Sequence, residues 1–167
     1  LGMSDQIKFN EFFLVDEYTD LKGCFKLDHI TLINNEINKV VREIKEFNLS
    51  PYESMLYIHK YITQNYEYGK YSSSDNTLRD REWNRSIVTA IADRKTICAG
   101  FASLTKAIVD RLNNSNLKCE YRTLLATKNK DKRHLKSEGG HATNFIHIED
   151  DKYHIKGTYA NDATFDC

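Results

Sequence analysis

The spacing of hydrophobic residues changes partway along this chain of 167 residues. Up to about residue 112, apolar residues recur every three or four positions, which is the period of a helix with one buried face. From residue 117 onward they alternate with polar residues, as in a strand with one buried face. Helices followed by strands are typical of the α+β class, in which the two kinds of element segregate. We therefore expect N-terminal helices packed on a C-terminal antiparallel sheet.

The helical period predicts helices over residues 27–47, 51–65, 83–93 and 98–112. The second should begin at Pro51, because Ser50-Pro51-Tyr52-Glu53 is a capping box with proline at the first helical position. The expected buried positions of the helices are Ile30, Ile33, Ile37, Val40, Val41, Ile44, Phe47, Met55, Ile58, Tyr61, Ile62, Ile87, Ala90, Ile91, Phe101, Leu104, Ile108 and Leu112.

Strands are predicted over residues 117–126, 142–148 and 153–159, with Asp150-Asp151 as the hairpin turn between the last two. Residues 66–80 and 127–140 are rich in turn-forming or charged residues and should be surface loops. We expect an N-terminal arm and helix over residues 1–49 and a core over 50–167, together forming one compact domain.

The composition of the chain limits the classes of binding partner that can be expected. Lys and Arg number 24, as do Asp and Glu, so no net charge favours nucleic acid or an anionic membrane. No apolar run approaches the ~20 residues of a transmembrane helix, and the first residues lack the pattern of a signal peptide. Both a cytoplasmic and a secreted location stay open, because four scattered cysteines make no disulfide framework.

Three segments carry the chemistry of a nucleophilic site. Cys98 begins a predicted helix, and the partial positive charge there favours a thiolate. His141 opens a predicted strand, and Asp162 is expected on the next strand, close enough to hydrogen-bond the imidazole. The order Cys, His, Asp on a helix and two strands predicts a catalytic triad with Cys98 as nucleophile.

These segments resemble the transglutaminase-like superfamily. Cys98-Ala99-Gly100-Phe101-Ala102 matches its Cys-x-Gly-Tyr-Ala core, Gly140-His141-Ala142-Thr143-Asn144 resembles its Gly-His-Ala-Trp-Asn strand, and Asn161-Asp162-Ala163-Thr164 is similar to its Asp-Pro-Thr segment. The resemblance extends from about Ser50 to the C-terminus. Thr143 and Ala163 depart from the family pattern, where Trp and Pro are frequent.

The resemblance implies a papain-like α+β core and thioester chemistry on amide bonds. Carried over residue by residue, it makes Cys98 the nucleophile, His141 the general base and acid, and Asp162 the residue that orients the histidine. Family members include transglutaminases, cysteine peptidases, other amidases and inactive relatives. We expect a peptidase or amidase rather than a cross-linking enzyme, acting on a protein or peptide. The alternatives are a non-catalytic peptide-binding or scaffolding module and an acyltransferase that uses a small-molecule donor.

Further site residues are less firmly indicated. Gly100 is small enough to let a substrate backbone approach, and Asn144 either lines the cleft or supports it. Trp83 either packs in the core or forms a cleft wall. The backbone N–H of Cys98 is a candidate oxyanion donor. Candidates for a second donor are Trp83, Gln64 and Tyr68.

Other polar residues have simpler interpretations. Asp166 is the rival of Asp162 as the orienting carboxylate. Surface or solvated positions are expected for His29, His59, His134, His147 and His154, and structural or incidental roles for Cys24, Cys119 and Cys167. A basic run just before His141 is either a solvated loop or a rim that selects acidic substrates; it comprises Lys128, Lys130, Lys132, Arg133 and Lys136.

No cofactor is expected, since the sequence has no CxxC or HExxH spacing and no acidic pattern typical of calcium. The oligomeric state stays open.

Overall fold

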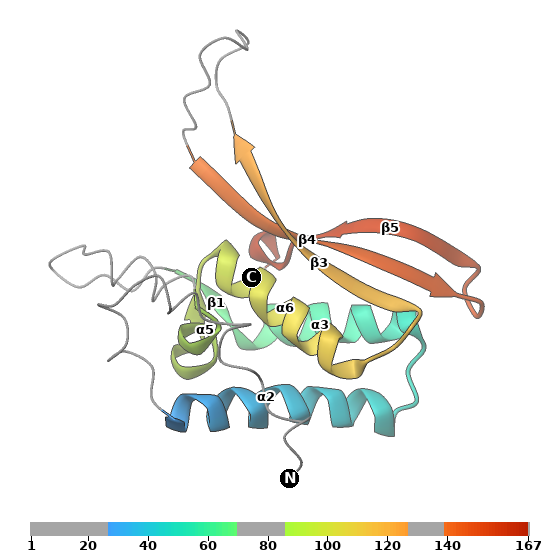
Figure 1. The fold of residues 1–167 in the computed structure, drawn as a ribbon, viewed down its shortest axis with the longest axis horizontal. Helices are drawn as coiled ribbons and strands as arrows, with labels where there is room; N and C mark the ends of the chain where they lie inside the picture. Colours follow the sequence, from blue (N-terminus) through green and yellow to red (C-terminus); the bar gives the residue numbers. More distant parts are fainter. Residues whose placement is uncertain (1–26, 70–85, 127–138, 167) are drawn as a thin grey trace, which may run out of the picture.

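Two layers make up the structure, a computed structural model that describes residues 27–69, 86–126 and 139–166: helices form one layer and an antiparallel sheet the other (Figure 1). The helices are α2 (Leu27–Glu46), α3 (Pro51–Asn65), α5 (Ile87–Asp93), α6 (Cys98–Leu112) and the short 3-10 helix η4 (Ala163–Phe165). The strands are β1 (Glu67–Tyr68), β2 (Lys95–Thr96), β3 (Leu117–Ala126), β4 (Gly139–Asp150) and β5 (Ile155–Asn161). The predicted α+β class is confirmed.

α2 buries the predicted stripe against the other helices. Its apolar residues from Ile33 to Ile44 are almost fully buried. Phe47, expected on the same stripe, is 63% exposed, and that prediction was wrong. The helix ends at Glu46, and Asn48 adopts a left-handed conformation (φ 50°) that turns the chain away from the helix axis.

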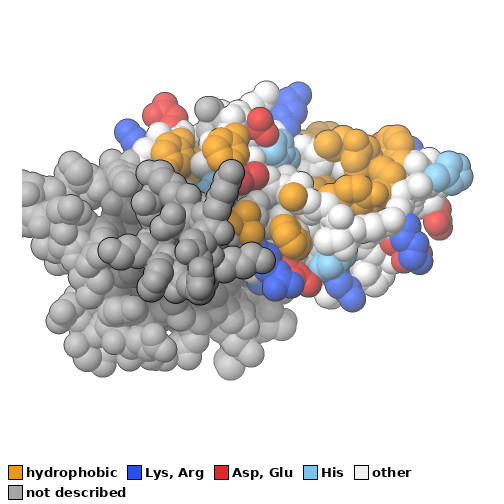
Figure 2. Space-filling view, turned by 90° about the horizontal axis from the view of Figure 1, so that it is seen from above, with side chains coloured by type: hydrophobic (Ala, Val, Ile, Leu, Met, Phe, Trp, Pro, Cys, Tyr) orange, Lys and Arg blue, Asp and Glu red, His pale blue; other side chains and the backbone are white. Residues whose placement is uncertain are grey.

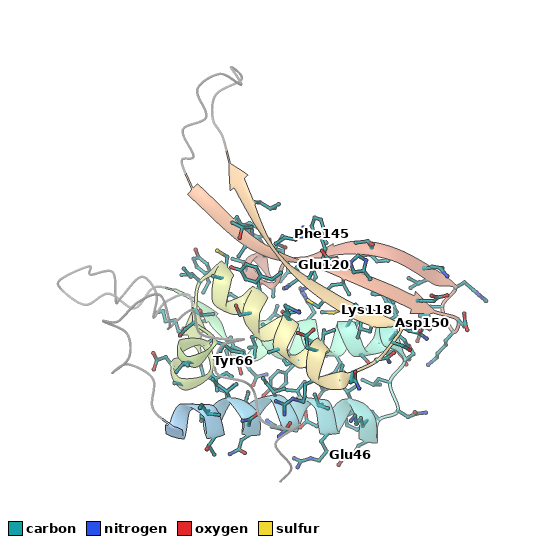
Figure 3. The ribbon with its side chains drawn as sticks, in the orientation of Figure 1. Glu46, Tyr66, Lys118, Glu120, Phe145 and Asp150 are labelled. Carbon is teal, nitrogen blue, oxygen red and sulfur yellow. The ribbon has the colours of Figure 1, made fainter. Side chains whose placement is uncertain are left out.

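The capping box of α3 is confirmed. The Ser50 hydroxyl accepts from the Glu53 N–H, and the Glu53 carboxylate accepts from the Ser50 N–H at 2.9 Å. Asp150, at the end of β4, accepts from the Ser50 hydroxyl at 2.5 Å and from the Tyr52 N–H at 2.8 Å. These bonds tie the start of α3 to the β4–β5 hairpin, far from the start of α6 (Figure 3).

α6 lies between α2 and the sheet and joins the two layers (Figure 1). Its Phe101, Leu104 and Ile108 are buried in one core that also takes in side chains of α2, α3, α5 and the sheet. The sheet order is β3-β4-β5, with both pairs antiparallel. Residues on one face of β4, such as Ile146, pack against α6.

The exit of α3 differs from the expected surface loop. Tyr66 is 2% exposed, and Glu67–Tyr68 pairs in parallel with Lys95–Thr96 as the small sheet β1-β2. Residues 70–80 of the expected loop lie outside the described residues, as do 1–26, the loop 127–138 and the expected start of the third helix at Trp83. Alternation of polar and apolar residues cannot reveal strands of two residues, because so short a segment shows no period.

An ionic network between the buried Glu36 and the partly exposed Arg94 holds this small sheet to α2. Glu36 of α2 accepts hydrogen bonds from Arg94, from Tyr61 at 2.5 Å and from Tyr66 at 2.7 Å (Figure 3). Burial raises the pKa of Glu36, but the hydrogen bonds from Arg94 and the two tyrosines outweigh it and lower that pKa to about 2. Arg94 directly precedes β2, so the network fixes the backbone that leads to Cys98.

The sheet face turned away from the helices is exposed. Figure 2 shows hydrophobic side chains there among charged residues of both signs. On this face His147 hydrogen-bonds Thr158 at 2.7 Å and Glu120 at 2.9 Å, and its side chain is 40% exposed. Among the described residues, no helix is long and apolar enough to cross a membrane.

Candidate active site

Cys98 is the first residue of α6, as the sequence predicts. It is a free, half-buried thiol that packs against a small cluster of Ala99, Ala102 and Ala142. Ile97 precedes it in extended conformation and offers no side-chain cap. The first N–H groups of a helix lack intrahelical acceptors and carry partial positive charge, so they can donate hydrogen bonds to an oxyanion at this position.

Gly100 lets α6 lie close to β2. A Cβ at this position would be 1.9 Å from the Thr96 hydroxyl oxygen, and Thr96 is fully buried. Gly100 is itself buried. The structure thus gives the glycine a packing role, and the substrate contact expected from the sequence stays a prediction.

His141 and Asp162 are brought together where β5 ends. The last residue pair between β4 and β5 is Asn144 with Asn161, so β5 stops before it reaches His141. The chain bends there into η4, and Asp162 hydrogen-bonds Nε2 of His141. The other carboxylate oxygen of Asp162 accepts from the Thr164 N–H at 3.1 Å. Both side chains are about one quarter exposed, at 28% and 24%.

The hydrogen bond to Asp162 leaves Nδ1 of His141 as the nitrogen available to a thiol. Ala142, the next residue, lies in the same cluster as Cys98, so the start of β4 is adjacent to the first turn of α6. Phe165 packs on the other side of the imidazole, with ring centroids 5.3 Å apart. Within the described residues, Nδ1 has no hydrogen-bond partner.

Asp166, the rival carboxylate, binds a different histidine. Its carboxylate lies 3.0 Å from Nε2 of His59, and Nδ1 of the same ring lies 2.8 Å from the Asn161 side-chain oxygen. His59 was expected at the surface without a partner, and that expectation was wrong: it is half-buried and has two partners. The partners are 102 and 107 residues away in sequence, so no local pattern could have revealed them.

Asn144 supports the site and does not line it. Its side chain is 1% exposed, and its amide donates to the carbonyl of Ala102 at 3.0 Å and to that of Glu120 at 3.4 Å. It thereby joins α6, β3 and β4 just beside His141. Of the two alternatives the sequence left open, the geometry favours support.

The remaining candidates are spread over the chain. Trp83 lies outside the described residues, as do Cys24, Cys167, His134 and the whole basic run before His141. Gln64 is exposed near the end of α3, and Tyr68 is 51% exposed on β1. Cys119 is buried, and burial raises the pKa of its thiol to about 12. It is therefore unsuited to act as a nucleophile.

Comparison with known proteins identifies the family and a similar fold. The model of the family DUF553, described as a transglutaminase-like domain, matches residues 35–157. A solved structure, "Crystal structure of a TGase", is similar over 90% of this chain, with a TM-score of 0.53 and 12% identity. The chain covers 35% of that protein, and likeness at this identity shows the fold alone. A search of curated proteins finds no match.

Proposed function

This chain belongs to the transglutaminase-like domain family, and we propose that it is a thiol-dependent amide-bond enzyme that forms a thioester on Cys98. The observation that carries the proposal is the hydrogen bond between His141 and Asp162 beside the helix start that holds Cys98. That combination supplies a nucleophile, a base and a group that orients the base. The protein or peptide nature of the substrate belongs to the same proposal.

The first half of the reaction forms the acyl-enzyme. His141 takes the proton of Cys98 through Nδ1, and the thiolate attacks the carbonyl carbon of the amide. Negative charge then develops on the carbonyl oxygen, where the Cys98 backbone N–H at the start of α6 is the candidate donor. One such donor is typically worth about 3–4 kcal/mol of barrier. When the tetrahedral intermediate collapses, His141 returns the proton to the leaving amine and the thioester remains.

The second half resolves the thioester. His141, now neutral, accepts a proton from the incoming nucleophile as that nucleophile attacks the thioester carbonyl, and the thiolate leaves. Asp162 stabilises the imidazolium in both halves through the hydrogen bond to Nε2. We propose water as the nucleophile, because water needs no dedicated binding site whereas an amine acceptor does. The product is then the free carboxylic acid.

Selective alkylation tests whether Cys98 is an activated thiol. The experiment uses the Cys24→Ser, Cys167→Ser background, which leaves Cys98 and Cys119 as the only thiols, and measures iodoacetamide labelling at each site by mass spectrometry. We expect Cys98 to react at a pH at which Cys119 stays unlabelled, since burial raises the pKa of Cys119 to about 12. His141→Ala should slow the labelling of Cys98 at that pH and leave Cys119 unlabelled.

The same measurement separates the enzyme from a binding module on the same fold. Slow labelling of both thiols, unchanged by His141→Ala, would favour the non-catalytic peptide-binding module. Labelling after unfolding in guanidinium provides the control, because both thiols should then react alike.

A further inference from the structure

One imidazole from α3 holds both ends of the turn that carries Asp162. His59 hydrogen-bonds the side chain of Asn161, which directly precedes Asp162, at 2.8 Å, and the carboxylate of Asp166, which follows η4, at 3.0 Å. In Figure 1 this short segment after β5 lies next to the start of α6, between the sheet and the helices. A single side chain thus closes a loop around residues 162–165.

The hydrogen bonds of His59 can hold residues 161–166 in one position. The His59 ring is 27% exposed, so the surrounding chain partly shields it from water. The Asp166 carboxylate can only accept, so Nε2 donates to it, and Nδ1 of the neutral ring then accepts from the side-chain amide nitrogen of Asn161 when that nitrogen faces the ring. Asp166 is 61% exposed and needs no partner for its own solvation. The pairing therefore acts on the position of the segment.

The position of Asp162 depends on this segment. One carboxylate oxygen binds His141, and the other caps η4 by accepting from the Thr164 N–H. If the segment rotated, the carboxylate would rotate with it and leave His141. On the β4 side the segment is held by the pairing of Asn161 with Asn144 in the sheet and by the Thr143 hydroxyl, which donates to the Asn161 carbonyl at 2.9 Å. His59 supplies the hold from α3, and it is the described side chain that binds both before and after η4.

We propose that His59 is a positioning residue, which holds the 161–166 segment so that Asp162 stays directed at His141. The inference rests on the proposed function, in which the orientation of His141 determines the reactivity of the Cys98 thiol. His59 does not touch the reacting atoms and acts only through Asp162. Its loss should weaken the reactivity of Cys98 without unfolding the protein.

The chain offers a matched control. His147 is also half-buried and also binds two side chains, Glu120 at 2.9 Å and Thr158 at 2.7 Å, but on the outer face of the sheet. His147→Ala removes as many hydrogen bonds as His59→Ala does. A difference between the two variants therefore depends on where each histidine lies, because both variants lose the same number of hydrogen bonds.

The first readout is the rate of Cys98 alkylation by iodoacetamide as a function of pH, measured in the Cys24→Ser, Cys167→Ser background. We expect His59→Ala to lower the rate at pH 7 by about 5- to 30-fold, the effect of losing one or two hydrogen bonds. The pH of half-maximal rate should rise toward that of Asp162→Ala. His147→Ala should match the parent protein, and thermal unfolding should show both variants folded.

The second readout is independent of the thiol chemistry. The ring N–H of His141 that donates to Asp162 should give a downfield proton NMR signal, assigned by its loss in His141→Ala and Asp162→Ala. We expect the signal to persist in His147→Ala and to weaken or exchange faster with solvent in His59→Ala.

The outcomes separate the two claims. If His59→Ala leaves both the signal and the alkylation rate within twofold of the parent, His59 is not a positioning residue, whatever the fate of the proposed function. Equal losses in His59→Ala and His147→Ala would overturn the inference as well. If the signal behaves as expected but His141→Ala does not change Cys98 reactivity, the positioning role stands and the proposed function fails.

Discussion

At the scale of single residues, the site depends on how the two nitrogens of His141 are divided between partners. Nε2 binds Asp162, and in the proposed function Nδ1 accepts the proton of Cys98. The order of the three residues and the element types of Cys98 and His141 could be predicted from the sequence, whereas Asp162 was expected on a strand and lies just after β5. Which nitrogen meets which partner could not, because it depends on where β5 stops and the chain bends into η4.

Asp162→Asn tests that division directly. The amide keeps the size of the carboxylate but does not stabilise the imidazolium, so proton transfer by His141 should suffer. We expect hydrolysis of a peptide amide or ester to fall by roughly 10²- to 10⁴-fold, the usual worth of positioned acid–base catalysis. Asp166→Asn is the matched control and should lose less than tenfold. Equal losses in the two variants would contradict the assignment of Asp162.

The pKa of Glu36 gives a second prediction, which concerns how the free energy of unfolding changes with pH. Its pKa in the folded state is about 2, against an ordinary value of 4.5, because hydrogen bonds from Arg94, Tyr61 and Tyr66 outweigh burial. A depressed carboxyl pKa contributes stability above the unfolded pKa, and this stability is lost as the pH falls from about 4.5 toward 2. The protein should therefore lose free energy of unfolding across that range.

Glu36→Gln should flatten this loss while lowering stability at neutral pH. The measurement is urea denaturation at pH 5 and pH 3, compared between the parent and the variant. Glu46→Gln is the control, since Glu46 is 63% exposed and meets Arg42 at 3.8 Å in water. If the free energy of unfolding falls between pH 5 and pH 3 by the same amount in Glu36→Gln as in the parent, the Glu36 network does not cause the pH dependence.

At the scale of elements, the approach of α6 to β2 determines where Cys98 lies. The helix limits Cys98–Leu112 and the capping box of α3 could be predicted because both signals are local. The burial of Tyr66 and the pairing of β1 with β2 could not, because they depend on Glu36 and Arg94, which lie far apart in the sequence. The same reason hid His59, whose partners lie on the last described segment.

Gly100→Ala tests this approach. A Cβ would come within 1.9 Å of the buried Thr96 side chain, so helix and strand must move apart. We expect a loss of about 1–3 kcal/mol in unfolding free energy, as for other overpacked sites, together with slower alkylation of Cys98. Gly140→Ala is the control for stability, because its Cβ would meet only Thr123 at 3.8 Å. Unchanged stability in Gly100→Ala would show that the contact is not tight.

At the scale of the whole molecule, the core does not divide at residue 49. Side chains of α2 from Ile33 to Ile44 lie in the same hydrophobic cluster as Ile58 of α3, Ile108 of α6 and Ile146 of β4. The fold class could be predicted from the change of period alone. The sharing of one core by distant elements could not, because periodicity shows which face is buried and not what covers it.

Removal of residues 1–48 should therefore abolish cooperative folding. The fragment would expose apolar surfaces of α5 and α6 that α2 covers, and would leave Arg94 without Glu36. Urea denaturation followed by circular dichroism should show no sigmoidal transition for the fragment and a clear one for the full chain. A cooperative transition in the fragment would mean that residues 49–167 form an independent domain.

The central claim, that Cys98 forms a thioester with an amide-bearing substrate, is tested most directly by intact-protein mass spectrometry after incubation with a peptide library and acid quenching. The account predicts an acyl adduct that maps to Cys98, is released by hydroxylamine and is missing from His141→Ala. Absence of any adduct on the folded parent protein across the library, or an adduct that forms equally well in His141→Ala, would contradict it.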